Sequence, residues 1–240
     1  INWARIIAQS VYYFYSYLSV EDASEPTNFS VPTGNFGDVY AGYLAKKMGL
    51  PINKLIVATN QNDILHRAIS KGSYEAEKVS ETISPSMDIQ IASNFERLIF
   101  DLNNGDDQQT SLDMKNIKEK GQYLINDDKL NKISENFLSA SLSENETLEV
   151  IKKVYEKFSV VLDPHTAIGY GAFDKHNLKG NNIVLATAHP CKFPDAVSKA
   201  INLKSDLPKE LEFILNEKED YDILENNLEK IKNYIIGKTK

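Results

Sequence analysis

The order of apolar runs, loops and helical stretches in the first 72 residues most strongly limits the fold. Two rounds of a strand-length apolar run, a loop and a helical stretch follow one another, and a glycine (Gly49, Gly72) ends each helical stretch. In chain order they are a strand at 29–32, a loop at 33–38, a helix to Met48, a strand at 55–58 and a helix from Asn62 or Asp63 to about Lys71. This alternation is typical of α/β folds, so we expect an open, mostly parallel sheet with flanking helices.

The rest of the chain divides by its polarity. Residues 112–143 are polar and mostly helical in pattern, whereas the apolar run at 182–186 predicts another buried strand, and two Lys- and Glu-rich helices are expected after Leu207. We therefore expect residues 1–100 to belong to the α/β domain, 101–159 to form a mostly helical insertion, and 160–240 to supply the final strand and C-terminal helices of the same domain.

Residues 1–20 are predicted to form a helix that is rich in aromatic side chains. Arg5 and Gln9 interrupt its apolar character, so the segment does not resemble a membrane anchor. Its five clustered aromatic residues are Tyr12, Tyr13, Phe14, Tyr15 and Tyr17. Because they cover more than one helix face, we expect burial on several sides; a surface for a partner in an oligomer is the alternative.

Composition excludes several function classes. Of the 240 residues, 42% are apolar, which fits a packed core, and 34 acidic residues against 27 basic ones give a net charge of −7. That surplus argues against nucleic acid as a partner. A single cysteine, Cys191, fits a reducing, cytoplasmic location, and the four histidines show no metal-ligand spacing.

The glycine loop, residues 33–38, carries the strongest chemical signal. It reads Thr-Gly-Asn-Phe-Gly-Asp and lies between a predicted strand and a predicted helix. Gly34 and Gly37 allow backbone N–H groups to approach an anion, and the helix behind adds partial positive charge. The loop lacks the residues of a Walker loop and the spacing of a dinucleotide-binding loop. A plain tight turn is the alternative.

A second signal is the Ala-Thr-Ala-His-Pro sequence that follows the predicted strand at 182–186. Ligands of open α/β sheets bind beyond the carboxyl ends of strands, where the Thr187 hydroxyl could bond a heterocycle nitrogen. A hydrogen bond from Thr187 to a neighbouring carbonyl is the alternative, and His189 is interpreted as structural. Asp163 and Pro164 are predicted to cap and begin a helix.

Several motifs taken together carry a resemblance that none carries alone. In one order the chain contains INWARI (1–6), VPTGNFGD (31–38), ATN (58–60), SPSMDI (84–89), SNFERL (93–98), DPHTA (163–167) and ATAHP (186–190). This set resembles the C-terminal part of the threonine synthase family, which has the tryptophan-synthase β-like fold of pyridoxal-phosphate enzymes. The resemblance is weakest at 101–150 and in the last thirty or so residues.

The resemblance implies a cofactor, pyridoxal 5′-phosphate, and a set of residues around it. The family's glycine loop holds the cofactor's phosphate, which would place Gly34, Asn35, Phe36, Gly37 and Asp38 there, and Thr187 would lie against the pyridine nitrogen. Members of the family are lyases of threonine biosynthesis that convert the small-molecule substrate O-phosphohomoserine and water into threonine and phosphate. Residues 1–100 would then be the C-terminal part of the cofactor-binding domain.

One departure from the family pattern concerns catalysis. The family's Schiff-base lysine lies in an N-terminal Ser-Phe-Lys-Asp-type motif, which this sequence does not contain. We therefore expect the chain to lack the N-terminal portion and to contribute no catalytic residue by itself. Two alternatives remain: a phospholyase relative that releases a keto acid, and a non-catalytic fragment that binds a partner.

Overall fold

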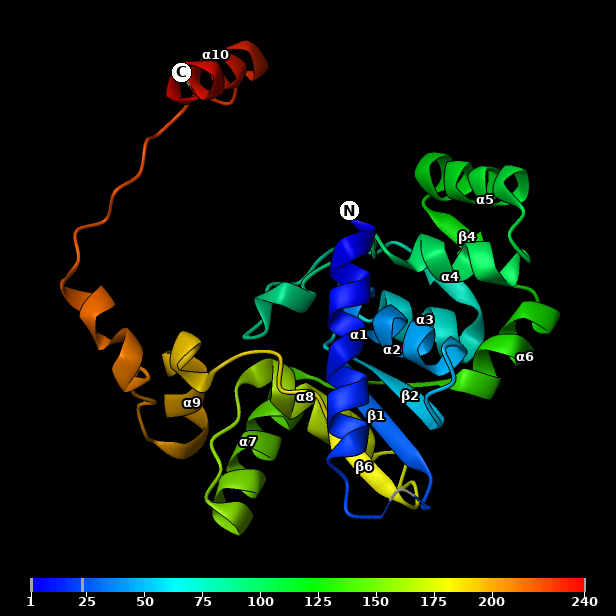
Figure 1. The fold of residues 1–240 in the computed structure, drawn as a ribbon, viewed down its shortest axis with the longest axis horizontal. Coiled ribbons are helices and arrows are strands. Elements are labelled where there is room, and N and C mark those ends of the chain that lie inside the picture. Colours follow the sequence, from blue (N-terminus) through cyan, green and yellow to red (C-terminus); the bar gives the residue numbers. More distant parts are fainter. Residues whose placement is uncertain (1, 23, 240) are drawn as a thin grey trace. The chain divides into compact units, whose positions relative to one another are not determined.

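The computed structural model describes residues 2–22 and 24–239, so Ile1 of the predicted first helix lies outside the described residues. The chain forms two compact units, residues 1–205 and 206–240. The first unit is built on a four-stranded parallel sheet with the strand order β5-β2-β1-β6 (Figure 1). Its strands are β1 (Thr27–Pro32), β2 (Ile52–Thr59), β5 (Phe137–Ser141) and β6 (Asn181–Val184). The predicted open parallel α/β fold is confirmed.

Helices cover both faces of this sheet, and β2 alternates between the two cores that they form. Leu55 and Val57 pack in one apolar cluster with α1, α2 and α3, whereas Ile56 and Ala58 pack in the other with α8. This period of two is expected for a strand buried on both faces. The helices are α1 (Trp3–Leu18), α2 (Gly37–Lys47), α3 (Ile64–Lys71), α4 (Phe95–Leu102), α5 (Asp107–Lys120), α6 (Asp127–Asn136), α7 (Glu144–Phe158), α8 (Pro164–Asp174) and α9 (Pro194–Ile201).

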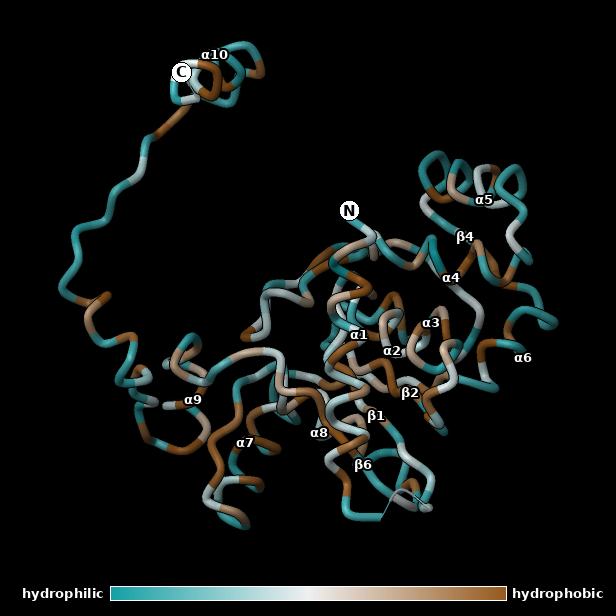
Figure 2. Tube along the Cα trace, in the orientation of Figure 1, coloured by the Kyte–Doolittle hydropathy of each residue, from teal (hydrophilic) through white to brown (hydrophobic). Residues whose placement is uncertain are grey.

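The segment at 101–159 differs from a purely helical insertion. It contains β5, which pairs with β2 from Leu55↔Phe137 to Thr59↔Ser141 and is therefore part of the main sheet. It also contains β4 (Gln122–Leu124), which pairs antiparallel with β3 (Ser73–Glu75). Figure 2 shows α5 and α6, which flank β4, as largely hydrophilic. The proposed division at 100 and 159 stays a prediction.

Helix α1 corrects the expectation of burial on several sides. Ile6, Ser10 and Tyr13 form its one buried row, while Tyr12 and Tyr15 are 55% and 72% exposed. This row faces the sheet, where the Tyr13 ring packs on that of Phe29 of β1 with 4.9 Å between the ring centroids. The expectation of burial on several sides is therefore wrong.

The later elements also differ in part from expectation. Strand β6 is half-buried rather than buried, because it pairs only with β1 in the described sheet. The two helices expected after Leu207 are present in the second unit, as one 3₁₀ helix, Lys209–Asn216, and one α-helix, α10 (Leu228–Lys238). Within residues 2–22 and 24–239, no helix is long and apolar enough to cross a membrane.

Candidate cofactor-phosphate site

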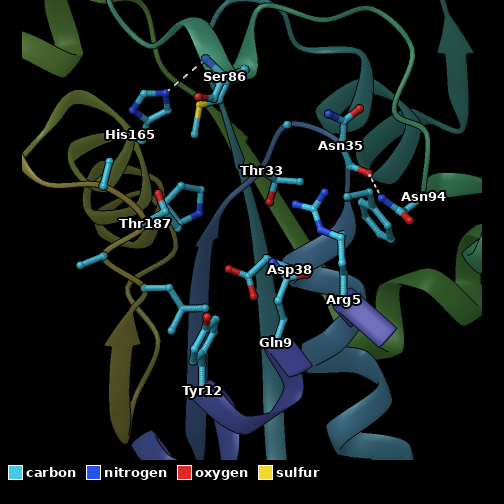
Figure 3. A pocket seen from close by; sticks show the side chains of 18 of the residues that line it. Arg5, Gln9, Tyr12, Thr33, Asn35, Asp38, Ser86, Asn94, His165 and Thr187 are labelled. Atoms are coloured by element: carbon cyan, nitrogen blue, oxygen red, sulfur yellow. Dashed lines mark hydrogen bonds between the residues drawn. The ribbon is translucent and has the colours of Figure 1, made fainter. Parts of the chain in front are cut away.

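The two segments singled out in the sequence meet at the carboxyl edge of the sheet. β1 and β6 are neighbouring parallel strands, in register from Thr27↔Asn181 to Ser30↔Val184. The glycine loop leaves β1 and Thr187 follows β6, so both reach the same edge. They line a cavity of about 770 Å³, in which Figure 3 shows Thr187 across from Asn35.

The residues of the glycine loop line this cavity. Phe36 takes the left-handed conformation (φ 64°) and caps the N-terminus of α2. In the part of the chain that the structure describes, no peptide N–H from Gly34 to Asp38 donates to a protein acceptor. A row of free amides at a helix N-terminus is a ready anion site.

Phe36 shapes the loop from behind. Its fully buried ring packs edge-on against that of Phe95, with 5.2 Å between the ring centroids, and lies 6.0 Å from that of Phe137. This anchor keeps the side chain in the core, and the residue as a whole is buried. Burial of a phenylalanine ring contributes about 1.5–3 kcal/mol to folding, which offsets a left-handed backbone cost of about 1–3 kcal/mol.

Close packing explains the need for glycine at position 34 better than at position 37. A Cβ on Gly34 would lie 2.3 Å from the main-chain oxygen of Ser86, so any side chain there forces the backbone apart. A Cβ on Gly37 would meet the Asn94 side-chain nitrogen at 3.3 Å, a tighter contact than usual but one that a side chain can relieve. Gly34 is therefore the stricter requirement.

The segment at 93–94 braces the loop from outside. The Asn35 main-chain oxygen accepts from the Asn94 N–H (3.0 Å) and the Asn94 side chain (3.1 Å). The Asn35 side chain accepts from the Ser93 hydroxyl at 3.2 Å. These bonds engage the oxygen atoms of Asn35 and leave its N–H free.

Asp38 brings a carboxyl group to the same cavity. The Tyr13 hydroxyl donates to its main-chain oxygen (2.8 Å) and lies 3.3 Å from its Oδ1. Burial raises the pKa of Asp38 to about 6, and the Tyr13 hydrogen bond lowers it by less. Asp38 therefore lines the cavity as an acid whose pKa lies above that of an ordinary carboxyl group.

The segment after β6 supplies a hydroxyl. Thr187 lines the cavity and, within residues 2–22 and 24–239, its hydroxyl bonds no protein group, so the alternative of a bond to a neighbouring carbonyl is wrong. His189 accepts from the Cys191 N–H at 3.2 Å, which agrees with the structural role predicted for it. Cys191 is a free, half-buried thiol.

A buried acid–histidine pair forms the wall opposite the glycine loop. Asp163 caps α8, as predicted, by accepting from the His165 N–H at 2.8 Å. It also lies 3.1 Å from His165 Nδ1, and its carboxyl bonds the Thr166 hydroxyl. His165 Nε2 in turn accepts from the Ser86 N–H at 3.3 Å. The pair thus holds Ser86, whose main-chain oxygen packs on Gly34.

Helix α1 also contributes residues to the cavity. Arg5, Gln9 and Tyr12 line the cavity, and Figure 3 shows them below the glycine loop. Their spacing of four and three places them on one helical face. That periodicity was the available signal, but the surrounding aromatic residues obscure it.

Comparison with solved structures defines the class of protein. The chain superposes on a pyridoxal-phosphate-bound threonine synthase from Brucella melitensis with a TM-score of 0.94 and 44% identity, covering 98% of this chain and 51% of that one. For the yeast threonine synthase the values are 0.90 and 42%, covering 100% and 53%. The fold is therefore that of the tryptophan-synthase β-like, fold-type II enzymes.

Sequence comparison then gives the family. A family model described as the C-terminal part of threonine synthase matches residues 166–235. Threonine synthase from Pseudomonas aeruginosa is 43% identical over 238 residues, and that from Saccharomyces cerevisiae 43% over 264 residues; each alignment covers 98% of this chain. The chain belongs to the threonine synthase family. It spans about half the length of these relatives.

Proposed function

We propose that the chain is the phosphate-binding part of a threonine synthase that uses pyridoxal 5′-phosphate and converts O-phosphohomoserine and water into threonine and phosphate. The observation that carries the proposal is the row of free N–H groups from Gly34 to Asp38 at the edge of a large cavity. The pyridoxal phosphate named for the Brucella melitensis relative supports this choice of ligand.

The residues present fit the cofactor at both of its polar ends. The amides of Gly34, Asn35, Phe36 and Gly37 would bond the phosphate oxygens, since free N–H groups at a helix N-terminus form an anion site. The Thr187 hydroxyl would hydrogen-bond the pyridine nitrogen and, being uncharged, would leave that nitrogen unprotonated. When bound, pyridoxal phosphate supplies the electron sink for chemistry at the substrate's α- and β-carbons.

Catalytic side chains are not assigned within this chain. The family's Schiff-base lysine belongs to a Ser-Phe-Lys-Asp-type motif that does not occur in the 240 residues. The proposed partners are thus the cofactor and a small-molecule phosphate ester, and the single cysteine favours a cytoplasmic location.

The test compares the chain alone with the full-length polypeptide that carries it. On incubation with O-phosphohomoserine and cofactor, we expect equal amounts of threonine and phosphate from the full-length polypeptide and none from the chain alone. Release of 2-oxobutyrate in place of threonine would favour the phospholyase alternative. Gly34→Ala tests the phosphate assignment, and an unchanged turnover in this variant would contradict it. Gly237→Ala is the matched control, because a Cβ there would meet no atom within 4 Å.

A further inference from the structure

The carboxyl group of Asp38 is an unexpected neighbour for a phosphate. It belongs to the first turn of α2 and points into the cavity that the glycine loop lines (Figure 3). Among the described residues, its side chain forms no ion pair, and the Tyr13 hydroxyl is its one hydrogen-bond partner. A partly buried carboxylate without a cation is costly, and a bound dianion beside it would add repulsion.

None of the other charged and titratable groups around the cavity bonds the Asp38 carboxyl group. Arg5 and Tyr12 on α1, His165 on α8 and Lys192 after β6 all line the cavity, but none bonds Asp38. Tyr13 faces Asp38 directly, and burial raises its pKa well above the usual value, so it remains a neutral donor. His165 is already engaged by Asp163 and by the Ser86 N–H.

One proton shared between the two acids removes the conflict. A carboxylic acid in a cavity can donate a hydrogen bond where its carboxylate would repel. Burial raises the pKa of Asp38 to about 6, and the second pKa of a phosphate monoester is also about 6. Both groups therefore lose their protons in the free state just below neutral pH, and bringing them together favours retaining one.

We propose that Asp38 and the cofactor's phosphate share one proton, so that this site takes up a proton when it binds a phosphate dianion. This inference rests on the proposed function and deepens it, because it assigns the protonation state in which the phosphate is held. Asp38 is then a binding residue that acts as a hydrogen-bond donor, and the free amides supply the remaining donors.

The experiment counts protons in the full-length polypeptide. The probe is pyridoxamine 5′-phosphate, which carries the phosphate but no aldehyde and so needs no lysine. Titration calorimetry at pH 8 in two buffers of different ionisation enthalpy gives the protons taken up on binding. Pyridoxamine, which lacks the phosphate, corrects for titration of the ring, and Asp38→Asn is the matched variant.

We expect the wild-type protein to take up about one more proton than Asp38→Asn. Its affinity relative to that variant should fall about tenfold between pH 7.5 and pH 8.5. Equal proton counts for the two proteins would overturn the inference while leaving the phosphate site intact. If Asp38→Asn fails to fold, the wild-type count corrected with pyridoxamine decides, and a value near zero overturns the inference. Failure of the wild-type protein to bind the probe would overturn the proposed phosphate site as well.

Discussion

Two neighbouring strand-to-helix connections follow the same topology but differ in how their polar groups are bonded. The glycine loop leaves β1, and the asparagine loop, residues 60–63, leaves the adjacent parallel strand β2. In the asparagine loop, Asn62 donates its N–H to Asn60 Oδ1 (2.8 Å) and its side chain to the Ser80 carbonyl (2.9 Å). Asn60 donates in turn to the Asp88 carboxylate at 2.7 Å.

The difference teaches that side chains, not topology, decide which connection can receive a ligand. In the asparagine loop, the asparagine side chains form hydrogen bonds with the polar groups around them. These bonds stabilise the fold and leave few groups for a ligand. In the glycine loop, the cited side-chain bonds hold Asn35 by its oxygen atoms and leave the N–H groups free. Changes in the asparagine loop should therefore affect folding, and changes in the glycine loop should affect binding.

The largest effect on binding is expected for Gly34→Ala. The new Cβ would lie 2.3 Å from the Ser86 oxygen, so the loop or the Ser86 peptide must move. Such overpacking costs about 1–3 kcal/mol, which corresponds to a loss of about 5- to 150-fold in affinity if it falls on the bound state. Calorimetric titration with pyridoxamine 5′-phosphate measures it. An unchanged affinity would contradict the assignment of the glycine loop to ligand binding.

Asn62→Ala should show the opposite pattern. The residue is 3% exposed and its side chain exchanges hydrogen bonds with Asn60, Ser80 and Asp88. Its removal leaves buried donors and acceptors unpaired, and we expect a loss of about 2–3 kcal/mol in the free energy of unfolding. Urea denaturation gives this value. A tenfold loss of probe affinity in the folded variant would show that the two loops are not separate in function.

Thr187→Asp examines the ring end of the site. A carboxylate beside the pyridine nitrogen would hold a proton there, whereas the threonine hydroxyl does not. We expect turnover to fall about tenfold, about 1.4 kcal/mol in the barrier, with cofactor content nearly unchanged. Absorbance of the bound cofactor and a threonine assay measure the two quantities, and Thr187→Ser should retain activity. Equal turnover in wild type and Thr187→Asp would contradict this role.

The smallest effect is expected for Gly37→Ala. Its Cβ would lie 3.3 Å from a nitrogen of the Asn94 side chain, which can shift by a few tenths of an ångström. We expect a two- to fivefold loss of affinity, about 0.5–1 kcal/mol. A loss larger than that of Gly34→Ala would reverse the ranking of the two glycines.

Local sequence signals predicted the elements that position the candidate site. A proline-ended apolar run, a glycine-containing loop and a glycine-stopped helix were sufficient for β1, the glycine loop and α2, because each depends on neighbours in the chain. The Asp163 cap and the strand before Thr187 were likewise predicted. Adjacency of β1 and β6 then follows from the fold family, not from either segment alone.

Features that depend on distant contacts could not be predicted. Strand β5 has the sequence Phe-Leu-Ser-Ala-Ser, whose serine and alanine favour no strand, and its pairing with β2 decides its structure. Burial of Asp38 depends on Tyr13, 25 positions earlier. The aromatic pattern of α1 is the same for a buried helix and for one with an open face, so its exposure was missed.

A crystal structure of the protein with pyridoxal 5′-phosphate tests the central claim most directly. The account predicts phosphate oxygens within hydrogen-bonding distance, about 2.7–3.2 Å, of the N–H groups of Gly34, Asn35, Phe36 and Gly37. A phosphate held instead by the side chains of Arg5 and Lys192, with those N–H groups facing only water, would contradict it.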